Sequence, residues 1–201
     1  MAAFFLSSLL LALCPGPDNL FVLTQALLYG PGAGIMVTAG LCTGLIGHTA
    51  AVALGVSAVF QLFPASFTAL KVCGAFFLLY LAVHAIRSSS GTNSPDPGKT
   101  RLKLSQLYRR GIIMNLTNPK VSLFFLAFLP QFADPSKGSL TLQLSFLGIV
   151  FAFATILVFG SISILAGSAA VKLQNNPLIF RIMNLVAATI YLLLAARLIF
   201  M

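Results

Sequence analysis

The sequence Pro15-Gly16-Pro17-Asp18-Asn19 interrupts the first apolar stretch of the chain, and Asn118-Pro119-Lys120 interrupts the fourth. Proline lacks the amide hydrogen that a helix needs, so it ends or kinks a helix. Inside a bilayer, such a break leaves backbone groups without partners, which is tolerated only where the break is buried in protein or lines a polar cavity. Paired breaks at matching positions in two halves of a chain are typical of a transporter's binding site.

Composition places most of this chain in a membrane. Of its 201 residues, 59% are hydrophobic and only 7% are charged, and the mean hydropathy is +1.01, which is far more apolar than one soluble core requires. A helix that crosses the hydrocarbon needs about 20 mostly apolar residues. Six stretches meet this requirement, at residues 3–28, 35–62, 65–86, 111–133, 139–168 and 178–200. The sequence therefore predicts an all-α polytopic membrane protein with six transmembrane helices, the first and fourth of which are broken.

The longest polar segment, residues 88–110, is rich in Ser, Gly and Pro and is typical of a flexible linker. It separates a first three-helix repeat, residues 1–87, from a second, residues 111–201. Because each half has an odd number of spans, the second half enters the membrane from the opposite side to the first. We therefore expect two inverted three-helix repeats.

Lysine and arginine are concentrated in this linker, which places it on the cytoplasmic side by the positive-inside rule. With six crossings, both chain termini are then external. The formal net charge is +9, but the basic residues are not interleaved with exposed aromatic residues, as they would be on a nucleic-acid-binding surface. We expect contact with membrane lipids and no nucleic-acid partner.

Glycine recurs at helical spacing along the second predicted span. Gly40 and Gly44 are separated by one helical turn, and Gly47 and Gly55 by two. Such stripes of small residues let neighbouring helix backbones approach closely. We predict that all four are helix-packing positions, although a gap beside a cavity would give the same pattern.

Asp18 is the only acidic residue in a predicted span, and Lys120 is the obvious partner for it. A charged side chain near the bilayer centre costs about 2.5–3.5 kcal/mol even on insertion scales, so each should face the protein interior. Asp18 follows Pro17 as Lys120 follows Pro119, so an inverted repeat would place the two charges at equivalent positions. Either the pair binds a ligand, or Asp18 only caps its half-helix and forms a structural ion pair with Lys120.

Each proline also begins a half-helix whose first amides lack partners, and such a helix N-terminus attracts a carboxylate. An amino acid has a carboxylate for these amides and an ammonium for Asp18, so we predict a zwitterion site between the breaks. Its candidate substrate-binding residues are Pro15, Gly16, Pro17, Asp18, Asn19, Asn115, Asn118, Pro119 and Lys120. Asp18 and His48 are candidate proton-coupling residues, although a lone histidine on a small-residue stripe equally fits a packing role.

Three other functions fit parts of the sequence. A divalent-metal exporter could use Cys14, Asp18, Cys42 and His48, but neither paired carboxylates nor a Cys-x-x-Cys run supports it. An intramembrane enzyme would need a nucleophile and a base within reach of each other, and a structural subunit would leave the paired breaks unexplained. We therefore expect a transporter that is not an enzyme and has no resident metal or cofactor.

Several segments together carry a resemblance to a known family: Pro15-Gly16-Pro17, residues 40–48, residues 71–81, and residues 115–120 with Pro130-Gln131-Phe132. Their order and spacing resemble those of the LysE/RhtB family of bacterial amino-acid exporters. The resemblance implies a six-helix protein of the bacterial inner membrane, amino-acid efflux driven by the proton gradient, and a homo-oligomer. The Gly-Leu-x-Thr-Gly-Leu-x-x-His run within residues 40–48 is closer to the branch that handles neutral amino acids such as homoserine, threonine or leucine.

Overall fold

The computed structural model describes residues 1–62, 65–88, 102–174 and 177–200, and all regular structure in these ranges is helical. The all-α prediction is therefore confirmed for this part of the chain. The elements are α1 (Ala2–Leu13), α2 (Pro17–Tyr29), α3 (Pro31–Leu62), α4 (Ala65–Ser88), α5 (Leu104–Thr117), α6 (Pro119–Leu123), the π-helix η1 (Phe124–Phe128), the 3-10 helices η2 (Leu129–Phe132) and η3 (Pro135–Lys137), α7 (Leu140–Gln174) and α8 (Pro177–Phe200).

Both predicted helix breaks are present at the prolines. Helices α1 and α2 meet at 63°, and α5 meets the helical segment Pro119–Phe132 at 50°; each bent pair is long and apolar enough to cross a membrane. Helices α3 and α7 contain unbroken stretches that meet the same test, at Pro31–Gly55 and Leu140–Ala166. Among the described residues, the structure thus has both predicted bent pairs and two long unbroken apolar helices that meet the requirement for a membrane span.

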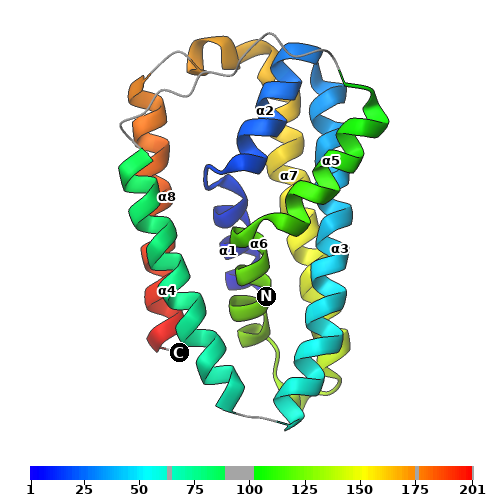
Figure 1. Cartoon of the computed structure of the whole chain (residues 1–201), viewed down its shortest axis with the longest axis vertical. Coiled ribbons are helices and arrows are strands. Elements are labelled where there is room, and N and C mark those ends of the chain that lie inside the picture. Colours follow the sequence, from blue (N-terminus) through cyan, green and yellow to red (C-terminus); the bar gives the residue numbers. More distant parts are fainter. Residues whose placement is uncertain (63–64, 89–101, 175–176, 201) are drawn as a thin grey trace.

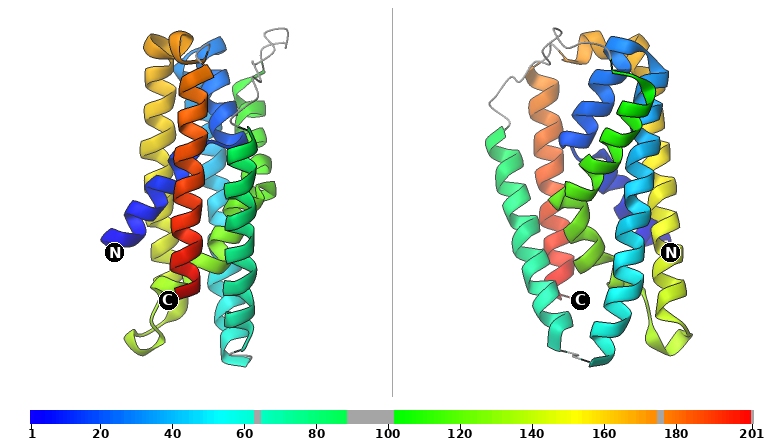
Figure 2. Two further views of the ribbon diagram at one scale, coloured as in Figure 1. Left: turned by 90° about the vertical axis from the view of Figure 1, so that its left-hand side faces the viewer. Right: turned by 45° about the vertical axis from the view of Figure 1, so that its right-hand side comes forward.

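The two broken spans lie in the middle of the bundle (Figure 1). On one side of them, α3 packs against α5 and α7, and α7 packs in turn against α1 and α2. On the other side, α4 and α8 run antiparallel along each other (Figures 1 and 2). Both chain ends lie in the lower half of Figure 1.

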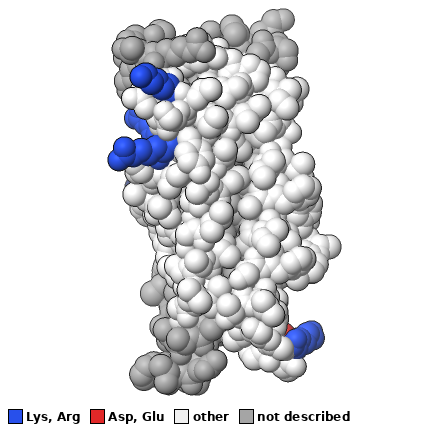
Figure 3. All heavy atoms as spheres, turned by 90° about the vertical axis from the view of Figure 1, so that its right-hand side faces the viewer, with Lys and Arg blue, Asp and Glu red and all other residues white. Residues whose placement is uncertain are grey.

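A broad band around the molecule is free of charged side chains on the face that Figure 3 shows. Lys and Arg gather toward the upper end of this face, and one group of charges marks the lower end (Figure 3). Large apolar side chains are exposed along the long helices, for example Ile46 of α3 and Ile149 of α7, both 67% exposed. An apolar belt between two polar ends is the surface that a lipid bilayer requires.

The polar linker is shorter than the sequence indicates. Residues 104–110, which were assigned to it, form the first turns of α5, while residues 89–101 lie outside the described residues. Leu107 is buried, whereas Arg109 and Arg110 are exposed. These turns are amphipathic, with one apolar face and one basic face. In the sequence, the many basic residues make the segment look like part of the polar linker.

Aromatic side chains fill the half of the second broken span that the positive-inside rule predicts to face outward. The Phe124 ring lies 5.2 Å from the Phe151 ring of α7, and the Phe132 ring lies 5.0 Å from the Phe4 ring of α1, measured between centroids. Pro130 has no N–H and cannot donate a hydrogen bond to the preceding turn. The helix departs from α geometry at this point: η1 before Pro130 is a π-helix, and η2, which contains Pro130, is a 3-10 helix. Five buried rings and the partly buried ring of Phe132 pack together here. We call them the outer aromatic cluster: Phe4, Phe124, Phe125, Phe128, Phe132 and Phe151.

Glycines let α3 and α5 touch along their backbones. A Cβ atom on Gly40 would overlap the carbonyl oxygen of Tyr108, and it would lie 3.0 Å from the Cα atom of Gly111. A Cβ atom on Gly44 would lie 2.7 Å from the Asn115 side chain. These two positions therefore tolerate only glycine at the observed helix separation.

The other two glycines of the predicted stripe differ. A Cβ atom on Gly47 would lie 3.0 Å from Cδ2 of Leu116, which is a tight contact with a flexible side chain. At Gly55, no described atom would come within 4 Å of an added Cβ atom, so its packing role stays a prediction.

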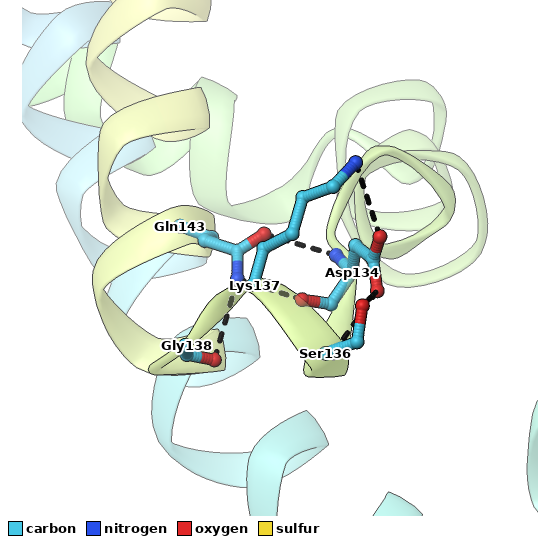
Figure 4. A network of polar contacts seen from close by, with 5 residues as sticks. All are labelled: Asp134, Ser136, Lys137, Gly138 and Gln143. Carbon is cyan, nitrogen blue, oxygen red and sulfur yellow. Dashed lines mark hydrogen bonds and ion pairs between the residues drawn. The ribbon is translucent and has the colours of Figure 1, made fainter.

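The loop that precedes α7 is held by a small polar network (Figure 4). Asp134 accepts hydrogen bonds from the backbone N–H and the hydroxyl of Ser136, and it forms an exposed ion pair of 3.1 Å with Lys137. These hydrogen bonds, followed by the Lys137 charge, lower the pKa of Asp134. Gln143 donates to the carbonyl of Asp134 at 2.9 Å and accepts from its N–H at 2.9 Å. This loop provides charged residues remote from the helix breaks.

Replacing Gly40 or Gly111 with alanine should destabilise the protein by about 1–3 kcal/mol, because the added methyl groups force two packed backbones apart. Gly160 of α7 is the matched control, since a Cβ atom there meets nothing within 4 Å, and Gly160→Ala should stabilise the helix by up to about 1 kcal/mol. Thermal unfolding in detergent micelles measures the difference. A melting temperature in Gly40→Ala as high as in Gly160→Ala would contradict the close approach of α3 and α5.

Candidate functional site

The two helix breaks face each other in the buried interior. The side-chain amide of Asn118 donates to Oδ2 of Asp18 at 2.7 Å. The Lys120 ammonium donates to the carbonyl oxygens of Cys14 at 3.0 Å and Leu11 at 3.3 Å, at the end of α1. The second broken span thereby holds both halves of the first.

The direct ion pair that the sequence suggests between Asp18 and Lys120 is not formed. Instead, each charge lies at a helix end of opposite sign: Asp18 in the first turn of α2, and the Lys120 ammonium at the last carbonyls of α1. The N-terminus of a helix carries partial positive charge, and the C-terminus carries partial negative charge. The two side chains are 3% and 8% exposed, so these contacts are screened little by water.

The first amides of α6 are not free, contrary to the expectation for both half-helices. Oδ1 of Asn118 accepts from the N–H of Lys120 at 3.0 Å, and its backbone oxygen accepts from Val121 and Ser122. Asparagine at this position therefore caps its own helix. The capped start of α6 therefore does not offer the Lys120 amide to a carboxylate.

The start of α2 is open, in contrast. Gly16 precedes it and has no side chain, and the structure provides no side-chain cap for the amides of Asp18 and Asn19. The nearest backbone bond runs from the N–H of Leu20 to the carbonyl of Gly16. Of the two predicted amide sites, only the one at α2 is available to an anion.

Unpartnered acceptors lie beside these amides. Oδ1 of Asp18 and Oδ1 of Asn19 are both buried and have no hydrogen-bond donor among the described residues, while Nδ2 of Asn19 donates to the carbonyl of Ala12 at 2.7 Å. A Cβ atom on Gly16 would lie 3.3 Å from the Lys120 ammonium and 3.8 Å from Oδ1 of Asn19. Gly16 therefore allows the start of α2, the Lys120 ammonium and the free oxygen of Asn19 to lie close to one another.

Asn115 and His48 form a second polar contact, against α3. Nε2 of His48 lies 3.1 Å from the carbonyl oxygen of Asn115, and because a carbonyl only accepts, Nε2 carries the proton. The His48 ring lies 5.6 Å from the Phe125 ring. The Asn115 side chain faces Gly44, and its Oδ1 has no donor among the described residues. This arrangement suits both packing and proton exchange, so both interpretations of His48 stay open.

The remaining predicted site residues shape the breaks. Pro17 and Pro119 are exposed first residues of α2 and α6, so they set the helix starts and do not face the interior. Pro15 is half-buried between α1 and α2. Sequence reasoning missed the carbonyls of Leu11 and Cys14, although the break itself was a signal, because a helix end exposes carbonyls as surely as a helix start exposes amides.

His, Cys, Asp and Glu side chains in the described ranges form no group of three that could hold a metal ion. Cys42 instead makes a long contact of 4.0 Å to the carbonyl of Ala152, and His48 is used at Asn115. The ligands proposed for a divalent-metal exporter are thus not brought together.

Comparison with known proteins identifies relatives. Residues 9–201 match the family described as LysE type translocator. The chain is 29% identical over 196 residues to a homoserine/homoserine lactone efflux protein of Salmonella typhimurium, covering 98% of this chain and 94% of that protein. It is 28% identical over 131 residues to a leucine efflux protein of Salmonella choleraesuis, covering 65% and 62% respectively. An uncharacterized membrane protein of Vibrio cholerae is 31% identical over 137 residues, covering 67% of this chain and 65% of its own length. No solved structure matches.

Asn118→Ala should lower stability by about 1–3 kcal/mol, because it removes the cap of α6 and leaves Oδ2 of Asp18 buried without a donor. Asn118→Ser keeps a capping oxygen and should recover part of the loss. Melting temperatures of the two variants and the wild type in detergent measure both contributions. A wild-type melting temperature for Asn118→Ala would mean that the Asn118 contact does not hold the breaks together.

Proposed function

The chain belongs to the LysE type translocator family, and we propose that it exports neutral amino acids such as homoserine, threonine or leucine across the bacterial inner membrane. The names of its relatives support this substrate class, since they describe efflux of homoserine, homoserine lactone and leucine. The observation that carries the proposal is the open start of α2, where free amides, unpartnered acceptors and an ammonium surround Gly16.

A zwitterion complements these groups. Its carboxylate would accept from the amides at Asp18 and Asn19, close to the Lys120 ammonium, which has an N–H beyond its two bonds to α1. Its ammonium would donate to the free oxygens of Asp18 and Asn19. The buried site carries one acid and one base, so a substrate without net charge keeps the site neutral.

The helix contacts support an inverted repeat and alternating access. Each broken span packs on the second helix of the other half: α1 and α2 on α7, and α5 on α3. The second helices α3 and α7 pack together, as do the third helices α4 and α8. We propose that the halves, residues 1–87 and 111–201, rock around the breaks and expose the site to each side in turn.

Proton coupling follows from competition for one carboxylate. Asp18 binds either the substrate ammonium or a proton, so a proton arriving from outside releases the substrate and the empty carrier returns protonated. His48 lies one contact away from the second break, through Asn115, and is the proposed relay. The chain's own residues therefore provide the exchange.

We further propose that the basic linker is cytoplasmic, both termini are external, and the protein forms a homo-oligomer. Arg109 and Arg110 of α5 are exposed near the end that would face the cytoplasm, as the positive-inside rule requires. Both chain ends lie in the lower half of the bundle in Figure 1, away from the start of α5, which agrees with this orientation.

Asp18→Asn and Lys120→Ala should each abolish export of radiolabelled leucine and homoserine from proteoliposomes, because each removes a charge that the zwitterion contacts. Asp134→Asn and Lys137→Ala are matched controls, since the same substitutions break only an exposed ion pair, and both should export at close to the wild-type rate. Folded protein is quantified by gel filtration in detergent. Wild-type export by Asp18→Asn and Lys120→Ala would falsify the proposed site.

His48→Gln tests the relay separately. Glutamine can still donate to the Asn115 carbonyl but cannot carry a proton, so the variant should lose export driven by a pH gradient while retaining substrate exchange without a gradient. Both rates are measured with labelled leucine in the same vesicles. Gradient-driven export at the wild-type rate would assign His48 a packing role only.

A further inference from the structure

We propose that the substrate reaches Asp18 from the inner end of the molecule, through a pocket between α2, α3 and α5, and that Gln25 of α2 binds its ammonium on the way. This inference rests on the proposed export function and adds an earlier amine-binding position to it. Gln25 and the pocket are not part of the site between the breaks.

The pocket has a volume of about 670 Å³, which is ample for an amino acid. It is lined by the end of α2 at Tyr29, the first turn of α3 at Ala33, and the start of α5, including Lys103, Ser105 and Leu107. These segments lie at the upper end of Figure 1, and described Lys and Arg side chains gather toward the same end in Figure 3. This is the side from which an exporter takes its substrate.

One face of α2 connects this pocket to the break. At about 100° per residue, Asp18, Val22, Gln25 and Tyr29 lie within an arc of about 60°. The first three are buried, and Tyr29 lines the pocket. At about 1.5 Å per residue, Gln25 is about 6 Å from Tyr29 and about 10 Å from Asp18 along the helix axis. A small amine can therefore pass from one to the next in short steps.

Gln25 has the chemistry of a transient amine site. It is 8% exposed, and its Oε1 has no hydrogen-bond donor among the described residues. A buried amide oxygen without a donor is destabilising and is rare in native structures. The unpaired atom of Gln25 is a hydrogen-bond acceptor, as are the unpaired oxygens of Asp18 and Asn19. All three oxygens therefore lack a hydrogen-bond donor, which an ammonium group would provide.

The two ends of the molecule are closed to different degrees. Outside the breaks, the outer aromatic cluster fills the space between α1, α7 and the second broken span. On the inner side, Val22 belongs to an aliphatic cluster with Ala33 and Leu107, and these two residues also line the pocket. This apolar cluster lies between the pocket and the level of Asp18, and because the pocket is on the inner side of it, we infer that access in this state is from the inside.

Initial uptake of labelled leucine and homoserine by inside-out membrane vesicles tests the path. Gln25→Met should raise the KM about tenfold, the loss expected for one hydrogen bond to a charged group, with Vmax changed by less than about twofold. Gln25→Glu restores an acceptor and should return the KM toward the wild-type value. Gln131→Met is the matched control, since Oε1 of Gln131 is also buried without a donor but lies on η2, in the outer half, and its KM should not change.

Ser105→Cys provides a second measurement that does not depend on replacing a buried residue. A membrane-impermeant thiol reagent should label this exposed position in inside-out vesicles above the wild-type background, and leucine should slow the labelling. Either an unchanged KM in Gln25→Met or a labelling rate indifferent to leucine overturns the path while the export function stands. A wild-type protein that exports neither amino acid would overturn the proposed function itself.

Discussion

Backbone groups at a helix break inside a bilayer find no water, so every amide and carbonyl there needs a partner from the protein. This chain meets the requirement at the end of α1 and at the start of α6 by setting its two breaks against each other. Lys120 covers the last carbonyls of α1, and Asn118 caps α6 while it holds Asp18. The remaining contacts of the bundle, including the glycine approach of α3 to α5, keep the two breaks at this distance.

The same contacts are compatible with the proposed transport site. The bonds between the breaks join the first and second halves of the chain, so the proposed rocking of these halves would require the bonds to be exchanged. A carboxylate and an ammonium hold the breaks, and an amino acid brings one of each. In the proposed export cycle, a substrate would replace these protein–protein contacts at low cost, because the groups it displaces and the groups it supplies are of the same kind.

Local signals made the breaks and the charged residues predictable. Proline ends or kinks a helix. A charged residue within a membrane span, such as Asp18 or Lys120, must be buried in the protein interior. The hydrogen-bond partners of Lys120 were not predictable, because it donates to backbone carbonyls at the end of α1 that only the tertiary arrangement brings near. The early start of α5 likewise depends on the neighbouring helix α3, against which α5 packs.

The two breaks look alike in sequence, yet the residue before each proline makes them chemically different. Asn118 has an oxygen that caps its helix, whereas Gly16 has none and leaves the amides of α2 without a cap. Gly16 also leaves room beside the Lys120 ammonium that a Cβ atom would reduce. If the two breaks bind a ligand as proposed, they contribute different groups to it: the capped break supplies the side chains of Asn118 and Lys120, and the uncapped break supplies the amides at the start of α2.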